Sequence, residues 1–234
     1  MVAYTVRKYH ILSIPVVDGE GRMVGIITSD DIMDVIEEEN TEDFEKMSGL
    51  APAEESYFKT GLFRLAANRL PWLLILMFTS ILSGAIISRF ESVLAVNILL
   101  SATIPMLMDS GGNCGQQAST LMIRGMALGE VKFRDLPRVL WTEIRVGLIV
   151  GIVMSVFTFA RLMLLNRAGL DIALVITVSL FATVVLAKSI GCTLPLLAQR
   201  VGFDPALAAS PLITTLVDAS SLFLYFSIAT RFIL

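Results

Sequence analysis

Histidine and cysteine are scarce in this sequence: one histidine, His10, and two cysteines, Cys114 and Cys192, stand among 234 residues. Each cysteine lies in a glycine-containing apolar stretch, which predicts small buried thiols rather than a disulfide framework or a zinc site. The shortage of soft ligands disfavours zinc and copper. No nucleophile with its base and no phosphate-binding loop is recognisable either, so we expect no enzyme.

Charged residues are also few, at 17%, whereas 55% of the residues are hydrophobic and the mean hydropathy is +0.76. Such a composition is typical of a membrane protein. The opening carries no secretory signal. Charge is divided unequally, because residues 1–58 hold 4 basic and 13 acidic residues and residues 59–234 hold 14 and 8. Two regions with different partners are therefore expected, and nucleic acid is not among these partners.

The acidic opening begins with two short β-branched runs, residues 14–17 and 23–28, on either side of the turn-forming "DGEG". This pattern predicts a β-hairpin. Thr28 or Ser29 then supplies a cap for a helix whose apolar residues follow helical spacing.

The stretch "PVVDGEGRMVGIITSDDIMDVI" resembles the second half of a CBS domain, a regulatory module that often binds adenine nucleotides. The resemblance implies that Gly25, Thr28 and Asp31 occupy the positions that contact ribose and phosphate, with ATP as the ligand. The alternative is that Thr28 only caps the helix. CBS motifs normally pair, and this chain begins inside one, so we expect an incomplete nucleotide cleft.

Residues 30–46 contain nine acids and one base, Lys46. The acids either form a solvated helix face or sense a divalent cation, which would relieve their mutual repulsion by bridging carboxylates. "SGLAP" should end this helix. Residues 49–69 should then form an amphipathic connecting helix that lies on the lipid headgroups. The predicted domains are a partial CBS module with the acidic helix (1–48), this connecting helix (49–69) and a membrane domain (70–234).

We expect a mainly α polytopic membrane fold with five transmembrane helices, preceded by a partial cytosolic α/β module. The five predicted spans are residues 70–88, residues 92–108, a third centred on 146–160 that extends over Glu143, Arg145 and Arg161, residues 172–187 running on through "SIGCTLPLLAQ", and residues 209–234. Pro105 and Pro195 should break two of these helices at matching depth. Basic residues gather on one side, which predicts a cytoplasmic N-terminus and an external C-terminus in the cell (inner) membrane.

The last span contains a lone acid, Asp218, and a charge near mid-span costs about 2.5–3.5 kcal/mol. It would serve in an ion pair, a proton relay or an ion pathway. A polar face surrounds it, made of Ser210, Thr214, Thr215 and Ser221. Further polar groups follow the second span, where "MDSGGNCGQQAS" provides Gly111, Gly112, Asn113, Gln116 and Gln117.

The stretches "MDSGGNCGQQASTLMIRGMALGEV" and "FDPALAASPLITTLVDASSLFLYF" resemble the glycine-rich signature and the final helix of MgtE-type magnesium transporters. The resemblance implies a homodimeric Mg²⁺ channel in the lipid bilayer, with a pore between subunits lined by spans two and five and with Asp218 at the ion site. It implies that Asp204 marks the cytoplasmic mouth. Cytoplasmic Mg²⁺ would close the pore by bridging this acid to the acidic helix at Glu38, Glu39, Glu42 and Asp43.

Magnesium also suits the available groups, because it sheds water reluctantly and a pore of carboxylates, amides and hydroxyls can hold the hydrated ion. Two alternatives stay open. One is a secondary transporter of Mg²⁺, Mn²⁺ or Co²⁺ coupled to H⁺ or Na⁺, and the other is a membrane-anchored cation sensor.

Overall fold

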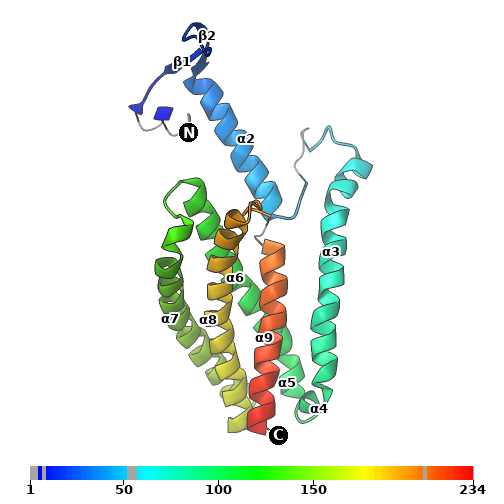
Figure 1. Cartoon of the computed structure of the whole chain (residues 1–234). Coiled ribbons are helices and arrows are strands. Elements are labelled where there is room, and N and C mark those ends of the chain that lie inside the picture. Colours follow the sequence, from blue (N-terminus) through cyan, green and yellow to red (C-terminus); the bar gives the residue numbers. More distant parts are fainter. Residues whose placement is uncertain (1–4, 7–8, 52–56, 208–209, 234) are drawn as a thin grey trace.

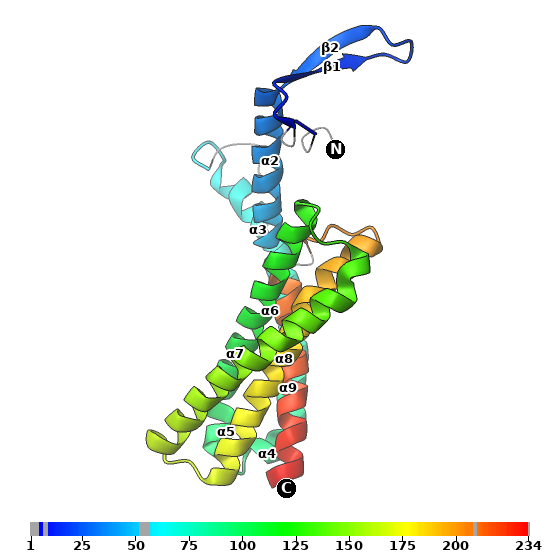
Figure 2. The ribbon, with the colours of Figure 1, turned by 90° about the vertical axis from the view of Figure 1, so that its left-hand side faces the viewer.

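The computed structural model describes residues 5–6, 9–51, 57–207 and 210–233. Its N-terminal part is a two-stranded antiparallel hairpin, β1 (Ser13–Val17) and β2 (Met23–Thr28), in which Ser13 pairs with Thr28. Helix α2 (Ser29–Met47) follows directly and stands at one end of a helical bundle, with the hairpin projecting beyond it (Figures 1 and 2). The predicted hairpin and helix are confirmed.

Helix α2 ends where the sequence predicts, at Gly49. This residue has φ +70°, a conformation that suits glycine, and its amide bonds back to the Lys46 carbonyl. Its α-carbon also lies against the Trp72 ring, so a side chain at this position would overlap the indole. The turn therefore fixes the end of α2 against the helix that carries Trp72.

The bundle contains five long helices: α3 (Leu62–Arg89), α6 (Ile104–Ala127), α7 (Leu136–Leu164), α8 (Leu170–Arg200) and α9 (Ser210–Ile233). The chain passes alternately from the α2 end to the opposite end and back (Figure 1). Within the described residues, α3, α7 with its preceding turn, α8 and α9 are long and apolar enough to cross a membrane. Helix α6 is more polar, but its 24 residues reach about 36 Å, which also suffices. The fold class is that of a multi-pass helical membrane domain.

Helix α3 differs from the expectation of a separate amphipathic helix before the first span. A single helix runs from Leu62 to Arg89 and contains Pro71. Proline at this point removes one backbone donor without ending the helix, which membrane helices tolerate. Residues 62–69 are thus the first turns of the first long helix.

The predicted second span, residues 92–108, is wrong. This stretch divides into α4 (Glu91–Leu94), α5 (Ile98–Ala102) and the start of α6. Asn97 causes one break, because its side chain accepts a bond from the Leu99 amide at 2.9 Å and so caps α5. The second crossing helix is α6, whose Gly- and amide-rich half was expected to follow the span.

The two prolines also behave differently from the prediction. Pro105 lies in the first turn of α6, where a missing amide costs nothing, and Pro195 lies inside an unbroken α8. Helix α6 begins at the end of the bundle far from α2, whereas α8 ends near α2 (Figure 1). Pro105 and Pro195 therefore belong to opposite ends of the bundle. The two residues therefore do not mark matching breaks.

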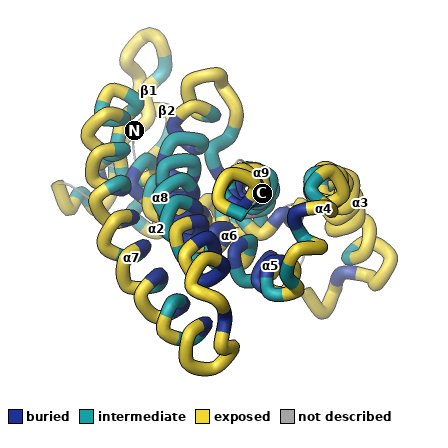
Figure 3. Tube along the Cα trace, turned by 90° about the horizontal axis from the view of Figure 1, so that it is seen from below, coloured by how far each residue is buried: buried dark blue, intermediate teal, exposed yellow. Residues whose placement is uncertain are grey.

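The core lies where α6, α8 and α9 meet, as the buried residues in Figure 3 show. Glycines permit this close packing: a side chain at Gly191 of α8 would collide with the backbone of Gly115 on α6. A Cβ added at Gly111 would come within 2.9 Å of Thr183 on α8 and 3.0 Å of Val217 on α9. Small residues thus allow the backbones of α6, α8 and α9, which all carry polar side chains, to approach closely.

Candidate functional site

Asp218 lies on α9 in the membrane part of the bundle and is half-buried. Its Oδ1 atom is buried and has no hydrogen-bond partner, and no lysine or arginine of the described residues pairs with it. A buried ion pair among the described residues is instead formed by Glu143 and Lys188, 3.9 Å apart between α7 and α8. The interpretation of Asp218 as half of a structural ion pair therefore finds no partner within the described chain.

The hydroxyl residues near Asp218 divide between two neighbouring helices. Thr214 faces α6, where its methyl group lies 3.2 Å from a Cβ built on Gly112. Thr215 turns toward α3, because its hydroxyl donates to the Pro211 carbonyl at 3.0 Å and lies 3.2 Å from the Thr79 hydroxyl. Ser210 is the first residue of α9, and its side chain lies outside the described residues.

The glycine-rich segment of α6 has two faces. Gly111 and Gly112 are buried against α8 and α9, so their shown role is close packing. Asn113 and Gln116 are exposed on the other side of the helix. The structure therefore separates the predicted pore residues of this segment into packing glycines and an uncovered amide face.

Asp204 lies in the connection between α8 and α9, at the α2 end, and contacts α2 directly. Its Oδ2 atom is 2.7 Å from Nζ of Lys46, and the same ammonium is 2.5 Å from Oε1 of Glu42. The Ala206 amide donates to Oδ1 of Asp204 at 2.9 Å. Asp204 and the acidic helix thus meet through Lys46, which the sequence analysis did not select as a site residue. The available signal was its position as the one base in the acidic run, four residues after Glu42.

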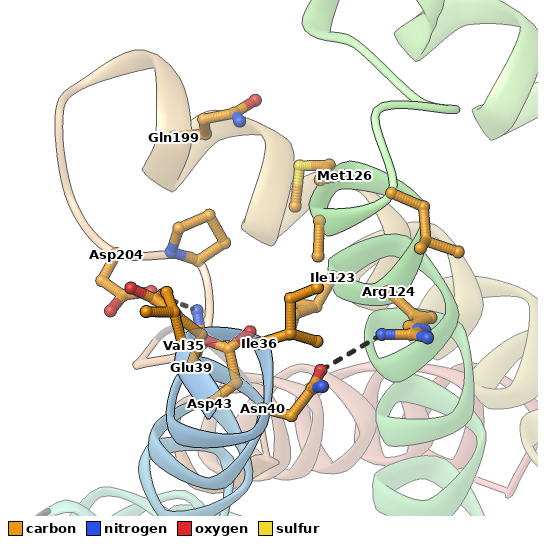
Figure 4. Close-up of a pocket in the computed structure, with 14 residues that line it drawn as sticks. Val35, Ile36, Glu39, Asn40, Asp43, Ile123, Arg124, Met126, Gln199 and Asp204 are labelled. Atoms are coloured by element: carbon orange, nitrogen blue, oxygen red, sulfur yellow. Dashed lines mark hydrogen bonds between the residues drawn. The ribbon is translucent and has the colours of Figure 1, made fainter. Parts of the chain in front are cut away.

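A cavity of about 590 Å³ separates α2 from the ends of α6 and α8 (Figure 4). Glu39 and Asp43 line it from α2, and Asp204 lines it from the α8–α9 connection. Asn40 and Arg124 also reach it and approach each other at 3.4 Å, the dashed contact at the right of Figure 4. Glu38, which was predicted with this group, is exposed and does not line the cavity.

The electrostatics of this cavity are unbalanced. Burial raises the pKa of Asp43, and the nearby Asp204 carboxylate raises it further. Burial also acts to raise the pKa of Asp204, but the Lys46 ammonium and the Ala206 amide outweigh this effect and lower it. Hydrogen bonds to Asp204 and Glu42 raise the pKa of Lys46. Lys46 is therefore a fixed cation, and Asp43 is left facing like charge.

The described residues contain no group of three His, Cys, Asp or Glu side chains placed to hold a metal ion directly. In this conformation the described acids around the cavity therefore form no group of three that could coordinate a metal ion directly. They could still attract an ion that keeps its water, since carboxylates accept hydrogen bonds from bound water.

Thr28 and Asp31, the predicted nucleotide contacts, bond to each other. The Asp31 amide donates to the Thr28 hydroxyl at 3.4 Å and the Thr28 amide donates to Oδ2 of Asp31 at 2.8 Å, which forms a capping box. The Thr28 hydroxyl also donates to Oδ2 of Asp31, at 2.6 Å. Bonds from the Thr28 hydroxyl and amide lower the pKa of Asp31. The two residues cap α2, which is the alternative that the sequence left open.

Comparisons with known proteins agree with this architecture. Residues 104–228 match the family model MgtE, described as divalent cation transporter, and residues 1–38 match the CBS domain model. The chain is 39% identical over 228 residues to the magnesium transporter MgtE of Thermus thermophilus, covering 97% of this chain and 50% of that protein. It is 38% identical over 232 residues to the magnesium transporter MgtE of Bacillus subtilis, covering 99% and 51%. The chain therefore spans about half the length of the curated relatives it matches.

Proposed function

The chain belongs to the MgtE family of divalent cation transporters, and on this premise we propose that it conducts Mg²⁺ across the cell membrane through a pore between two copies of the chain. The observation that carries the proposal is the unpaired Asp218 carboxylate at membrane depth. An isolated charge there is expensive, so a permeating cation is the most economical partner. Helices α6 and α9 would line the pore.

Hydrated Mg²⁺ fits this lining better than a bare ion does. Magnesium prefers six oxygens in a tight octahedron and gives up its water slowly, so a pore that binds the hydrated ion avoids most of the dehydration cost. Asp218 and Thr214 on α9 offer oxygens, and Asn113 and Gln116 lie on the uncovered face of α6. Across a two-fold axis, two Asp218 carboxylates would match the charge of one ion. Gly111 and Gly112 would contribute by keeping α6 close to α9.

The cavity beneath α2 suits a regulatory role for the same ion. Glu39, Asp43 and Asp204 surround it, and Lys46 already ties Glu42 to Asp204. Mg²⁺ entering from the cytoplasm would neutralise the acids that Lys46 leaves unpaired, and so hold α2 against the α8–α9 connection and close the pore. Exposed Glu38 would add only long-range attraction. The positive-inside pattern supports a cytoplasmic position for this end and an external C-terminus.

The test is radioisotope-free Mg²⁺ influx into proteoliposomes that contain a fluorescent magnesium indicator. Wild type should conduct, and Asp218→Ala should remain a folded dimer without influx. Asp171→Ala is the matched control, since Asp171 is an exposed acid in the first turn of α8. Normal influx through Asp218→Ala would overturn the pore assignment.

The same preparation separates the alternatives. A channel gives unitary currents in planar bilayers, whereas a carrier coupled to H⁺ or Na⁺ gives saturable flux that follows the driving gradient. A cation sensor gives neither, and its signalling should tolerate Asp218→Ala. Influx of Mn²⁺ and Co²⁺ measured beside Mg²⁺ establishes the selectivity.

A further inference from the structure

Asp109 of α6 carries no role in the pore described so far, although it lies in the polar half of that helix. We propose that Asp109 is a second carboxylate of the ion path, placed at the depth of Asp218, and that it sets the affinity of the pore for hydrated Mg²⁺. The inference rests on the proposed function, because it assigns a further residue to the same path.

The register of α6 against α9 places the two acids at one level. These helices run in opposite directions (Figure 1), and Gly112 meets Thr214 at their contact. Asp109 precedes Gly112 by three residues, about 4.5 Å along α6, and Asp218 follows Thr214 by four residues, about 6 Å along α9. Both steps lead toward the end of the bundle far from α2. The two carboxylates therefore differ in depth by only about 2 Å.

The helical angle also keeps both acids near the contact between the helices. A step of three residues rotates Asp109 by about 60° from the line of Gly112, and a step of four rotates Asp218 by about 40° from the line of Thr214. Asp109 is also the charged side chain that acts electrostatically on Asp218. The two groups thus experience a common field.

Asp109 belongs to the uncovered face of α6. The exposed polar residues of this helix lie on one face, and they are Asp109, Asn113, Gln116, Gln117, Thr120 and Arg124. The face leads from Asp109 to Arg124, which lines the cavity beneath α2. Among the described side chains, no ion pair or hydrogen bond involves the Asp109 carboxylate.

Two unpaired carboxylates at one depth repel each other unless a cation lies between or beside them. Each chain would provide two such groups, so a two-fold pair would surround the ion with four. This exceeds the charge of one Mg²⁺ and would raise its local concentration at the site. Removing Asp109 should therefore weaken binding, while Asp218 still supports passage.

The test compares the concentration dependence of Mg²⁺ influx in full-chain proteoliposomes. Asp109→Asn should raise the half-saturating Mg²⁺ concentration by roughly tenfold, because one charge per chain is lost near the ion. Its maximal influx should stay within about twofold of wild type. Asp109→Glu, which keeps the charge, should restore most of the affinity. Asp171→Asn, an exposed acid at the same end of the bundle, should change neither quantity.

The outcomes separate this inference from the proposed function. An unchanged Asp109→Asn together with an inactive Asp218→Asn removes Asp109 from the path and leaves the pore intact. Equal shifts in Asp109→Asn and Asp109→Glu show that charge is not the cause, which also overturns the inference. Activity in both Asp109→Asn and Asp218→Asn overturns the pore itself. Asp109→Ser, checked for folding by its elution and thermal unfolding, provides a second uncharged variant that must repeat the shift.

Discussion

The two acidic regions of this molecule balance their charge in different ways. Beneath α2, Asp204 is paired with Lys46 at 2.7 Å, and the neighbouring acids are partly open to water. Between α6 and α9, Asp218 has a buried oxygen without a partner among the described residues. The ammonium of Lys46 is a fixed cation that stabilises the contact of α2 with Asp204. Asp218 has no such fixed cation among the described residues, so its carboxylate can attract a mobile one. Under the proposed function, this difference would let one ion act both as regulator at α2 and as permeant ion at Asp218.

The largest effect is expected when a fixed positive charge is introduced beside Asp218, so that both acidic regions have a lysine partner. Thr214→Lys places an ammonium one turn from Asp218, in imitation of Lys46 beside Glu42. Influx should fall by about a hundredfold, since a tethered charge competes with every arriving ion. Thr214→Gln, which has a long side chain but no charge, is the control in the same flux assay. Equal loss in both variants would mean that side-chain size, and not charge, blocks the path.

The next effect concerns closure. The triple variant Glu42→Gln, Asp43→Asn and Asp204→Asn neutralises two acids of the cavity, Asp43 and Asp204, and the Glu42 carboxylate that pairs with Lys46. It removes acids that would attract the regulatory ion. Currents in excised patches should then persist at internal Mg²⁺ concentrations that close wild type, with the closing concentration raised by about tenfold or more. Glu38→Gln, exposed and outside the cavity, should shift closure much less. If the triple variant closed at the same internal Mg²⁺ concentration as wild type, the cavity would have no role in gating.

Removing only the fixed charge of Lys46 should have a smaller effect on closure. Lys46→Gln leaves Asp204 and Glu42 unpaired, which weakens the contact of α2 with the α8–α9 connection by about 1 kcal/mol. Closure should then need roughly fivefold more internal Mg²⁺. Lys46→Arg preserves the charge and should resemble wild type. Easier closure of Lys46→Gln would show that the lysine competes with the ion instead of assisting it.

The smallest effect is a pH dependence of the α2 contact. The pKa of Asp43 is raised in the docked state by burial and by Asp204, so its ionised form opposes docking. Docking of α2 on the bundle should therefore strengthen as the pH falls through the raised pKa of Asp43 toward the ordinary aspartate pKa of 3.8. Asp204, whose pKa is lowered, stays ionised through this window and keeps its bond to Lys46. Spin-label distances between α2 and the bundle, in wild type and Asp43→Asn, measure this change. Asp43→Asn should lose this pH dependence. If the distance changed with pH equally in both proteins, another titrating group would be responsible.

Local features were predictable because neighbouring residues determine them. The hairpin, the Thr28 cap and the end of α2 at Gly49 follow from β-branched runs, a capping side chain and a glycine in the left-handed region. The second span was misplaced because this prediction also used only neighbouring residues. Hydropathy averages over a window and does not distinguish faces, so it placed the span before the polar segment that in fact forms α6.

The sequence by itself determined that this chain is a multi-pass helical membrane protein of the MgtE family, because composition and the glycine-rich signature are properties of consecutive residues. Only the tertiary structure decided which charges have partners. Lys46 and Asp204 are separated by 158 positions, and the depth of Asp109 relative to Asp218 depends on how α6 packs against α9. Electrostatic energy varies with distance in space and with burial, and neither quantity can be read from the order of residues along the chain.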